Sequence, residues 1–425
     1  MRIYPFAACF SLIATLSIGV GQAWSPWNWT SAGPAGSSHA VLREIRKGWS
    51  LHPYHTLPES ITTLMVEDKS TRKTQGFVYA GTSGSAGIYR VSPLTQNAVS
   101  TLSNGMGDAL TFGTCHINRV VLHDMDGDGL PELLGSSSQV EPRGRPRLCV
   151  WSSSFNGPAL RAVARPEIAS SWSHSIDFLP RPGKGSDSVF VTFCGFGEVV
   201  EYRLEPATEG SSFHGENLGW KVVGTLPTSG EWLQIVDADN DGKQDICVAT
   251  GYSPGHAAVI LYASDEPGSM LRETRRLDEG GRFGNVRFLA GPLEKDGGQD
   301  LIAWWCTGNA DGDAEVIVYR LGGEGIVRRT VVARGPASDL WADDDRFTFA
   351  DLDDDGRKEV WFSTYSGKLW RFDPAHSNAT ELMASFQEGL GPVASGPDIS
   401  GKRQRLYLGW ERQIFGFELQ PSSTN

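Results

Sequence analysis

The stretch Asp351-Leu-Asp-Asp-Asp-Gly-Arg-Lys-Glu359 carries carboxylates at positions one, three, five and nine, with Gly356 at position six. Alternate side chains of a tight loop can converge on one point, and Ca2+ takes about six to eight oxygen ligands. The glycine permits the sharp turn, and the carbonyl of Arg357 can add a neutral oxygen. This pattern predicts a calcium loop.

The same pattern occurs at 124–132 and 237–245, and a worn copy at 292–300 has lost the carboxylate of position one. We therefore expect Ca2+ at three loops, and weak binding or none at the fourth. The predicted ligands are Asp124, Asp126, Asp128 and Glu132; Asp237, Asp239, Asp241 and Asp245; Asp351, Asp353, Asp355 and Glu359.

Short apolar runs, rich in β-branched and aromatic residues, lie on both sides of each acidic loop. Such runs predict strands. An EF-hand would need a long helix on each side and a glutamate at position twelve, and neither is present. The loops therefore connect two strands.

The acidic loops belong to a longer repeat. The unit begins near seven residues, about 46 to 60 residues apart: Leu64, Asn118, Ser173, Glu231, Val286, Arg346 and Pro392. Each unit has four short stretches of strand character, which is typical of a propeller blade. We predict an all-β fold, a seven-bladed β-propeller with four-stranded blades and calcium-binding loops over 48–420. Residues 48–57 supply the outer strand of the last blade, and 421–425 form a tail.

The beginning of the chain has the character of a secretory signal. Residues 1–23 contain one arginine, an apolar run and small residues where cleavage is expected. Residues 24–47 read as an irregular N-terminal arm. We therefore expect a secreted protein, with acceptor sequons for glycosylation at Asn28 and Asn378.

Charge and cysteine content limit the class of protein. The formal net charge is −12, which three calcium ions would halve, and no cluster of lysine and arginine suggests a nucleic-acid partner. No run after the signal is long and apolar enough to span a membrane, and we expect a monomer. Five cysteines remain after cleavage, which leaves at least one free thiol and the pairing open: Cys115, Cys149, Cys194, Cys247 and Cys306.

A second repeated position lies five residues before position one of each loop. Five neighbouring units carry Arg119, His174, Trp232, Arg287 and Arg346 there. These positions begin the innermost strands, at the end opposite the acidic loops, so the side chains would gather at one mouth of the central channel. Further polar and aromatic candidates close to this mouth are His116, Trp172, Glu231, Tyr252 and Trp341.

Two interpretations of this register stay open. Arginine with tryptophan suits an oxygen-rich or anionic ligand, because guanidinium forks hold carboxylates and indole faces stack on sugars. Alternatively, these strands begin with whatever residues satisfy exposed backbone ends, and the arginines are solvated or pair with the acidic cluster at residues 343–345.

The loops and the sevenfold repeat resemble the FG-GAP/VCBS propellers, the class that includes the integrin alpha head, over residues 48–420. The likeness lacks a literal Phe-Gly…Gly-Ala-Pro repeat, and units one, three and seven lack the acidic loop. It implies structural calcium on one face and binding or catalysis on the other. Similar secreted propellers include seven-bladed lectins, polysaccharide lyases and the propeller part of aldos-2-ulose dehydratase, so the fold does not choose a function.

Three functions follow from these features. The first is a lyase or dehydratase acting on a sugar, uronate or related molecule, with an arginine holding the developing enolate, His174 or His116 as base, and Glu231 or Tyr252 as acid. The binding residues would be Arg119, Trp232, Arg287, Arg346, Trp172 and Trp341. The alternatives are a lectin-like or adhesive binding module and a natural-product tailoring enzyme. No nucleophile elbow, zinc-protease helix, dinucleotide fingerprint or P-loop is present.

Overall fold

The structure is a computed structural model. It describes residues 42–66, 78–84, 88–91, 99–102, 115–123, 132–139, 147–151, 160–164, 173–181, 187–193, 197–203, 219–251, 254–294, 298–308, 311–323, 325–340, 345–374, 379–387, 389–397 and 403–420. Every regular element in these ranges is a β-strand. The part of the chain that the structure describes has no helix long and apolar enough to cross a membrane.

Three sheets contain four consecutive strands each, paired antiparallel in chain order. The first consists of β11 (Ser173–Leu179), β12 (Ser188–Phe193), β13 (Glu198–Arg203) and β14 (Gly219–Thr225). The second consists of β15 (Ser229–Val236), β16 (Asp245–Gly251), β17 (Ala258–Ala263) and β18 (Arg272–Leu277). The third consists of β19 (Asn285–Gly291), β20 (Asp300–Cys306), β21 (Asp313–Gly322) and β22 (Gly325–Pro336).

Two further sheets combine strands from both ends of the chain. One contains β23 (Phe347–Ala350), β24 (Glu359–Ser363), β25 (Lys368–Phe372) and β26 (Thr380–Phe386), with β1 (Leu42–Ile45) as a fifth strand outside β26. The other contains β27 (Val393–Pro397), β28 (Gln404–Trp410) and β29 (Gln413–Leu419), with β2 (Trp49–Thr56) on the outside. Backbone pairing of β2 with β29 therefore joins the first described strands to the last.

The N-terminal arm is more ordered than the sequence predicts. Residues 42–45, expected to be irregular, form β1, which pairs with β26 from Leu42 to Ile45. Arg46 adds an ion pair with Glu381, with 2.9 Å between Nη1 and Oε2. The outer edge of β26 offers unpaired backbone groups, and β1 satisfies them.

The remaining eight strands lie in one sheet. These are β3 (Ser60–Val66), β4 (Val78–Gly84), β5 (Ile88–Val91), β6 (Val99–Leu102), β7 (Cys115–His123), β8 (Glu132–Gln139), β9 (Arg147–Trp151) and β10 (Leu160–Ala164). The end of β4 pairs with the start of β7 and joins two runs of four strands. The described residues thus form six sheets, and the seven separate blades predicted from the sequence are not confirmed.

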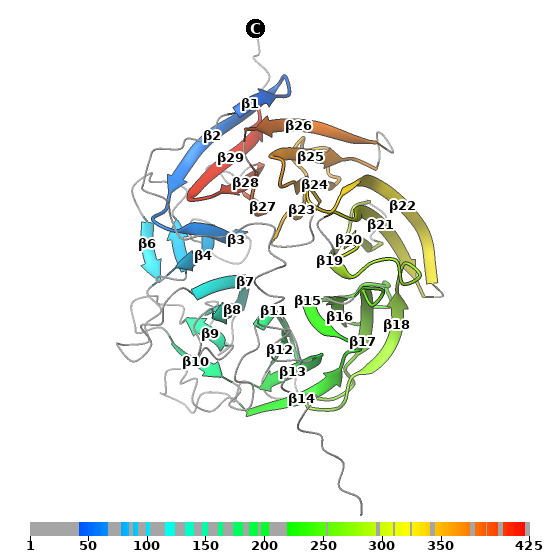
Figure 1. Ribbon diagram of the computed structural model, residues 1–425. Helices are drawn as coiled ribbons and strands as arrows, with labels where there is room; N and C mark the ends of the chain where they lie inside the picture. The colour runs from blue at the N-terminus through cyan, green and yellow to red at the C-terminus, as the bar shows by residue number, and fades with distance from the viewer. Residues whose placement is uncertain are drawn as a thin grey trace, which may run out of the picture.

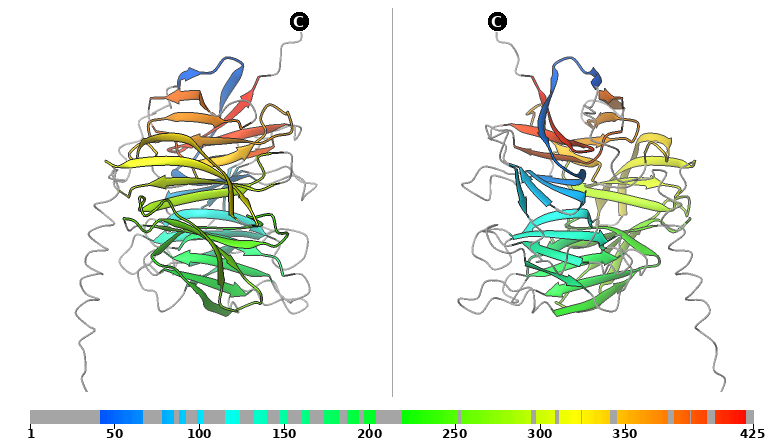
Figure 2. Two further views of the ribbon diagram at one scale, coloured as in Figure 1. Left: turned by 90° about the vertical axis from the view of Figure 1, so that its right-hand side faces the viewer. Right: turned by 60° about the vertical axis from the view of Figure 1, so that its left-hand side comes forward.

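The sheets are arranged around a common centre as a β-propeller, with β3, β7, β11, β15, β19, β23 and β27 nearest to it (Figure 1). Figure 2 shows the same ring of sheets from two sides. Every residue of β16, β20 and β24 is buried, because neighbouring sheets cover both faces of these second strands. The outer strand β18 is mostly exposed, and half of the residues of β22 are exposed. The core therefore lies between consecutive sheets, and clusters of apolar side chains cross from one sheet to the next.

Candidate functional site

The acidic loop 237–245 joins β15 to β16 and is closed by its own first carboxylate. Asp237 accepts hydrogen bonds from the N–H groups of Asp241, at 3.0 Å, and Gly242, at 2.9 Å. The backbone turns through positive φ at Asn240 (60°) and Gly242 (85°). Asparagine and glycine tolerate this conformation best, so the residue types themselves favour the turn.

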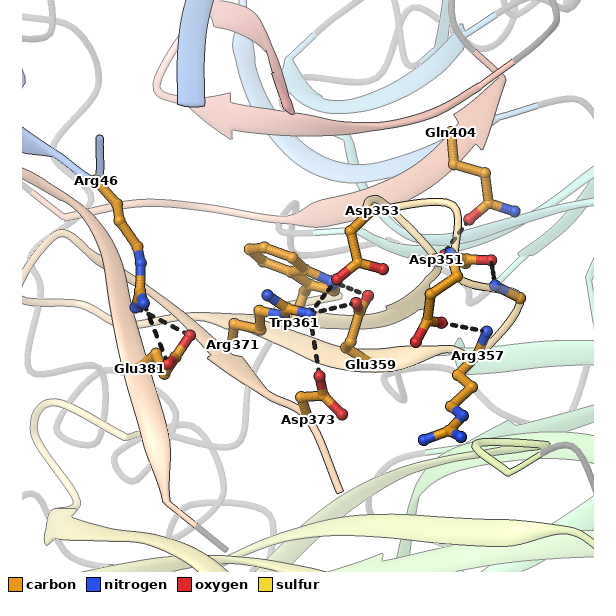
Figure 3. Close-up of polar contacts among 12 residues, drawn as sticks. Arg46, Asp351, Asp353, Arg357, Glu359, Trp361, Arg371, Asp373, Glu381 and Gln404 are labelled. Carbon is orange, nitrogen blue, oxygen red and sulfur yellow. Dashed lines mark hydrogen bonds and ion pairs between the residues drawn. The ribbon is translucent and has the colours of Figure 1, made fainter. Parts of the chain in front are cut away.

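The loop 351–359, between β23 and β24, repeats this geometry. Asp351 accepts from the N–H groups of Asp355, at 3.1 Å, and Gly356, at 2.8 Å. Positive φ recurs at the same positions of the loop, four and six, at Asp354 (62°) and Gly356 (80°). Gln404 of β28 accepts the N–H of Asp351 at 2.9 Å, so this loop also contacts the next sheet (Figure 3).

Carboxylate oxygens converge in both loops. Ligand atoms of Asp237, Asp239 and Asp245 lie within 4.8 Å of one another, and so do those of Asp351, Asp353 and Asp355. Such closely spaced oxygens suit a hard cation like Ca2+. In the first group, burial raises the pKa of Asp245 to about 6; the N–H of Ala238 lowers it, and the charges of Asp239, Asp241 and Asp237 raise it. The donor set therefore fits a divalent cation.

The carboxylates at position nine differ in their cation partners. Asp187, in the corresponding position before β12, lies 2.7 Å from Nε2 of His123. Asp300 in the worn loop pairs with Arg320, and Glu359 pairs with Arg371. Asp245 is buried and has no ion pair with any residue that the structure describes. Of these sites, the 237–245 loop is thus the one where a bound metal ion would neutralise a buried carboxylate that has no cation partner among the described residues.

Arg371 of β25 lies against the 351–359 loop (Figure 3). Its Nη2 is 2.6 Å from Asp353, 2.7 Å from Glu359 and 3.1 Å from Asp373. Burial raises the pKa of Glu359 to about 7, while the charge of Arg371 and the indole N–H of Trp361 lower it. The position-nine carboxylate is therefore already in contact with a cation from the chain.

The worn loop 292–300 has an arginine as well. Arg320 of β21 holds Asp300 by two hydrogen bonds, Nε to Oδ1 at 2.9 Å and Nη2 to Oδ2 at 2.6 Å. Asp300 is fully buried. A parallel fork of this kind is the strongest arrangement for an arginine and a carboxylate.

Sequence reasoning missed these arginines, although a signal was present. Four third strands carry an aromatic residue followed directly by arginine: Tyr89 and Arg90, Tyr202 and Arg203, Tyr319 and Arg320, Trp370 and Arg371. Asp373, two residues after Arg371, was also missed because it lies outside the acidic loop.

For the third predicted calcium loop, Asp124, Asp126 and Asp128 lie outside the described residues, as does the side chain of Glu132. The prediction of calcium there therefore rests on the sequence pattern.

The structure places the second repeated register on the innermost strands. Arg119, His174, Trp232 and Arg287 lie on β7, β11, β15 and β19, and Arg346 directly precedes β23. Trp232 and Arg287 are only 5% exposed, and Arg346 only 4%. These three side chains are therefore not open to solvent.

The arginines of this register bind backbone. Arg119 and Arg287 donate to the carbonyls of Leu233 and Glu231, on either side of Trp232. Their guanidinium carbons lie 4.3 Å and 5.2 Å from the centre of the Trp232 ring. The two arginines thus contact β15 from β7 and from β19.

The arginine at the start of β23 makes the same kind of contact. Arg346 donates to the carbonyl of Leu390 and stacks 3.6 Å from the ring centre of Tyr365. Innermost strands have one edge without a pairing strand, and arginine can satisfy the carbonyls there. These contacts favour the interpretation that the arginines satisfy exposed backbone.

Carboxylates near the centre complete this network. Arg119 lies 3.6 Å from Asp177, and Thr63 donates to Asp345. Burial raises the pKa of Asp345, while Arg119, Thr63 and Arg287 lower it part of the way. Asp345 is the member of the acidic cluster 343–345 that the structure describes, and the charges of Arg119 and Arg287 act on it.

The predicted catalytic groups are only partly described. Glu231 lies on β15 and its side chain is fully buried. The side chains of His116 and His174 lie outside the described residues, as do Tyr252, Trp172, Trp341, Asn28 and Asn378. Cys247 and Cys306 are buried, and they form no disulfide with each other.

No protein-family model matches the chain, and no curated protein matches it. Among solved structures, the chain is similar to BBS1N from its crystal structure in complex with ARL6DN, soaked with lead. The TM-score is 0.53 at 10% identity, over 90% of this chain and 99% of that chain. At this identity the likeness shows the fold alone, a β-propeller.

Proposed function

We propose that the chain is a calcium-stabilised β-propeller that serves as a binding module, with Ca2+ held by the acidic loops between the first and second strands of a blade. The observation that carries this proposal is the pair of loops 237–245 and 351–359. They share the same carboxylate spacing, the same hydrogen bonds from Asp237 and Asp351, and converging oxygens. Calcium would neutralise the buried Asp245 and tie β15 to β16.

The proposal also includes what the sequence predicts beyond the described residues. The loop 124–132 is the third calcium site, the chain is secreted, and the eight-stranded sheet corresponds to two blades of an FG-GAP/VCBS-like ring of seven. The two four-stranded runs β3–β6 and β7–β10 support this count, because they join only through β4 and β7.

Binding is favoured over catalysis by the state of the central residues. An elimination needs a cation and an acid that reach the substrate. Arg287 and Arg346 are buried against backbone carbonyls, and Glu231 is fully buried. BBS1N, a propeller of similar fold, was solved with the protein ARL6DN. The candidate ligands are therefore of two classes: a protein, and the oxygen-rich molecules, above all carbohydrates, that the sequence suggests.

Calcium titration of the purified chain after treatment with a chelator tests the metal. We expect at least two calcium ions to bind by isothermal titration calorimetry, one fewer in Asp237→Asn and one fewer in Asp351→Asn. Asp265→Asn is the control, because Asp265 is exposed and lies outside the loops. A chain that binds no calcium, with an unchanged melting temperature, contradicts the proposal.

The lyase or dehydratase hypothesis predicts a different result. Incubation with uronic-acid polymers or keto-sugars would give an unsaturated product that absorbs in the ultraviolet. We expect no such product, and we expect glycan or protein binding that persists in His174→Ala. Turnover that is lost in His174→Ala would restore the enzyme interpretation.

A further inference from the structure

The contacts of Arg371 are unlike those of an ordinary arginine pair. Three carboxylates, from Asp353, Glu359 and Asp373, approach the single nitrogen Nη2 at 2.6 to 3.1 Å. The Nε of the same side chain is buried and has no hydrogen-bond partner among the described residues. Figure 3 shows the three carboxylates around the end of the guanidinium.

This geometry resembles the surroundings of a metal ion more than a guanidinium pair. Nη2 carries two hydrogens and cannot donate a good hydrogen bond to three acceptors at once. Arginine normally uses its planar fork, with two parallel bonds to one carboxylate. Here the carboxylates converge on a point, and one oxygen of Asp353 is buried without a hydrogen-bond partner in the described part of the chain.

Arg320 provides the contrast within the same molecule. It forms the two-bonded fork with Asp300, and Arg328 lies 3.5 Å from the same carboxylate. The loop it serves has Pro292 where the other loops have the first aspartate. That loop therefore has a well-fitted guanidinium and lacks a ligand that calcium needs.

We propose that arginines from the third strand act as tethered cations that replace calcium to different degrees in different blades. This inference rests on the proposed calcium function. At 292–300, Arg320 has replaced the metal completely. At 351–359, Arg371 occupies the position-nine half of the site and shares Asp353 with the metal half, formed by Asp351, Asp353 and Asp355.

In the loop 237–245, no arginine that the structure describes contacts the position-nine carboxylate of Asp245. The described arginine closest to its carboxylates is Arg275, which lies 3.5 Å from Asp239 and also donates to the carbonyl of Gly323 at 3.0 Å. Calcium affinity should therefore decrease in the order 237–245, 351–359, 292–300. Repulsion between a guanidinium and a calcium ion that share one carboxylate lowers affinity by about tenfold or more.

Terbium luminescence can report metal binding to the 351–359 loop separately from binding to the other loops. Trp361 donates its indole N–H to Glu359 at 3.2 Å and can sensitise a lanthanide bound in this loop. The probe is Tb3+ displaced by Ca2+, measured on the full chain, and Asp351→Asn identifies the signal of this loop by removing it.

Arg371→Gln is the decisive variant. We expect the Ca2+ affinity of the 351–359 loop to rise about tenfold or more, and the melting temperature to decrease in chelator and recover with Ca2+. Arg320→Gln is the matched control: its melting temperature should decrease equally with and without Ca2+. Arg371→Lys keeps the charge and should keep the affinity near that of the parent.

The outcomes separate this inference from the proposed function. If the parent binds no Ca2+, the proposed function fails. If the parent binds Ca2+ but Arg371→Gln leaves the affinity of the 351–359 loop unchanged or weaker, the tethered-cation inference alone is wrong. Should Arg371→Gln fold only with Ca2+ present, the Ca2+ dependence of its refolding is the same readout and supports the inference.

Discussion

The two ends of the innermost strands carry charge in opposite ways. At the start of β19 and β23, Arg287 and Arg346 are buried and donate to backbone carbonyls. At the opposite end, Asp245 begins β16 across from Val236, the last residue of β15, and is buried beside other carboxylates without an ion pair to a described residue. Both ends show a charged residue at a repeated position. At the acidic end Asp300 and Glu359 are paired with arginines, whereas Asp245 has no ion pair among the described residues. A charged residue at a repeated position therefore indicates a ligand only where the protein itself supplies no partner for that charge.

Removal of calcium should give the largest effect in this comparison. Each site stabilises the folded state by about 2.7 kcal/mol when the free ligand is 100 times its dissociation constant. With two described loops, chelation should lower the free energy of unfolding by about 5 kcal/mol. Denaturant unfolding with chelator and with Ca2+ measures it, with Mg2+ as the control ion. Equal free energies of unfolding in chelator and in Ca2+ would mean that the acidic loops, like the arginines at the opposite end, need no bound ion.

Removal of a central arginine should come second. Arg287→Met keeps much of the buried stem but leaves the carbonyl of Glu231 without this donor, which costs about 1–3 kcal/mol. The loss should be the same with and without Ca2+, because the two ends act independently. Arg272→Met, at an exposed position of β18, is the control and should change stability little. If Arg287→Met is as stable as the parent but no longer binds the ligand, Arg287 belongs to the binding site and its role is not structural.

Gly242→Ala tests the turn of the acidic loop. Gly242 has a φ of +85° and nothing within 4 Å of an added Cβ, so the penalty is purely conformational. We expect a loss of about 1–2 kcal/mol, with weaker calcium binding. Gly323→Ala is the control, since it also has open space around an added Cβ but no positive φ. Equal stability of the two variants would show that the loop tolerates another turn.

The smallest effect concerns pH and the central carboxylate Asp345. Burial raises its pKa above the ordinary value of 3.8, and Arg119 and Arg287 oppose that shift. A carboxyl with a raised folded pKa holds its proton more tightly when folded, so stability decreases as pH rises from 3.8 through the folded pKa. Asp345→Asn should remove this part of the slope in unfolding free energy measured against pH. An unchanged slope would mean that the arginines fully compensate the charge.

The amino-acid sequence by itself determined the features that depend on neighbouring residues. The acidic loops, their closing hydrogen bonds and their positive-φ residues lie within nine consecutive positions, and the propeller strands follow from short apolar runs between them. Such features depend on backbone sterics and on side chains that reach only a few residues along the chain. The calcium ions themselves, the secretion signal and the identity of the ligand stay predictions.

Tertiary structure alone decided which charged side chains have partners within the protein and how many separate sheets form. Arg371 contacts Asp353 from another strand, Arg119 reaches Leu233 across 114 positions, and β4 pairs with β7 at two residue pairs. A strand pattern specifies which residues face inward but not which neighbour a long, flexible side chain meets there. The energy of a buried charge depends on that neighbour, through desolvation and pairing, and so the same arginine pattern could have meant either an open binding site or a closed structural network.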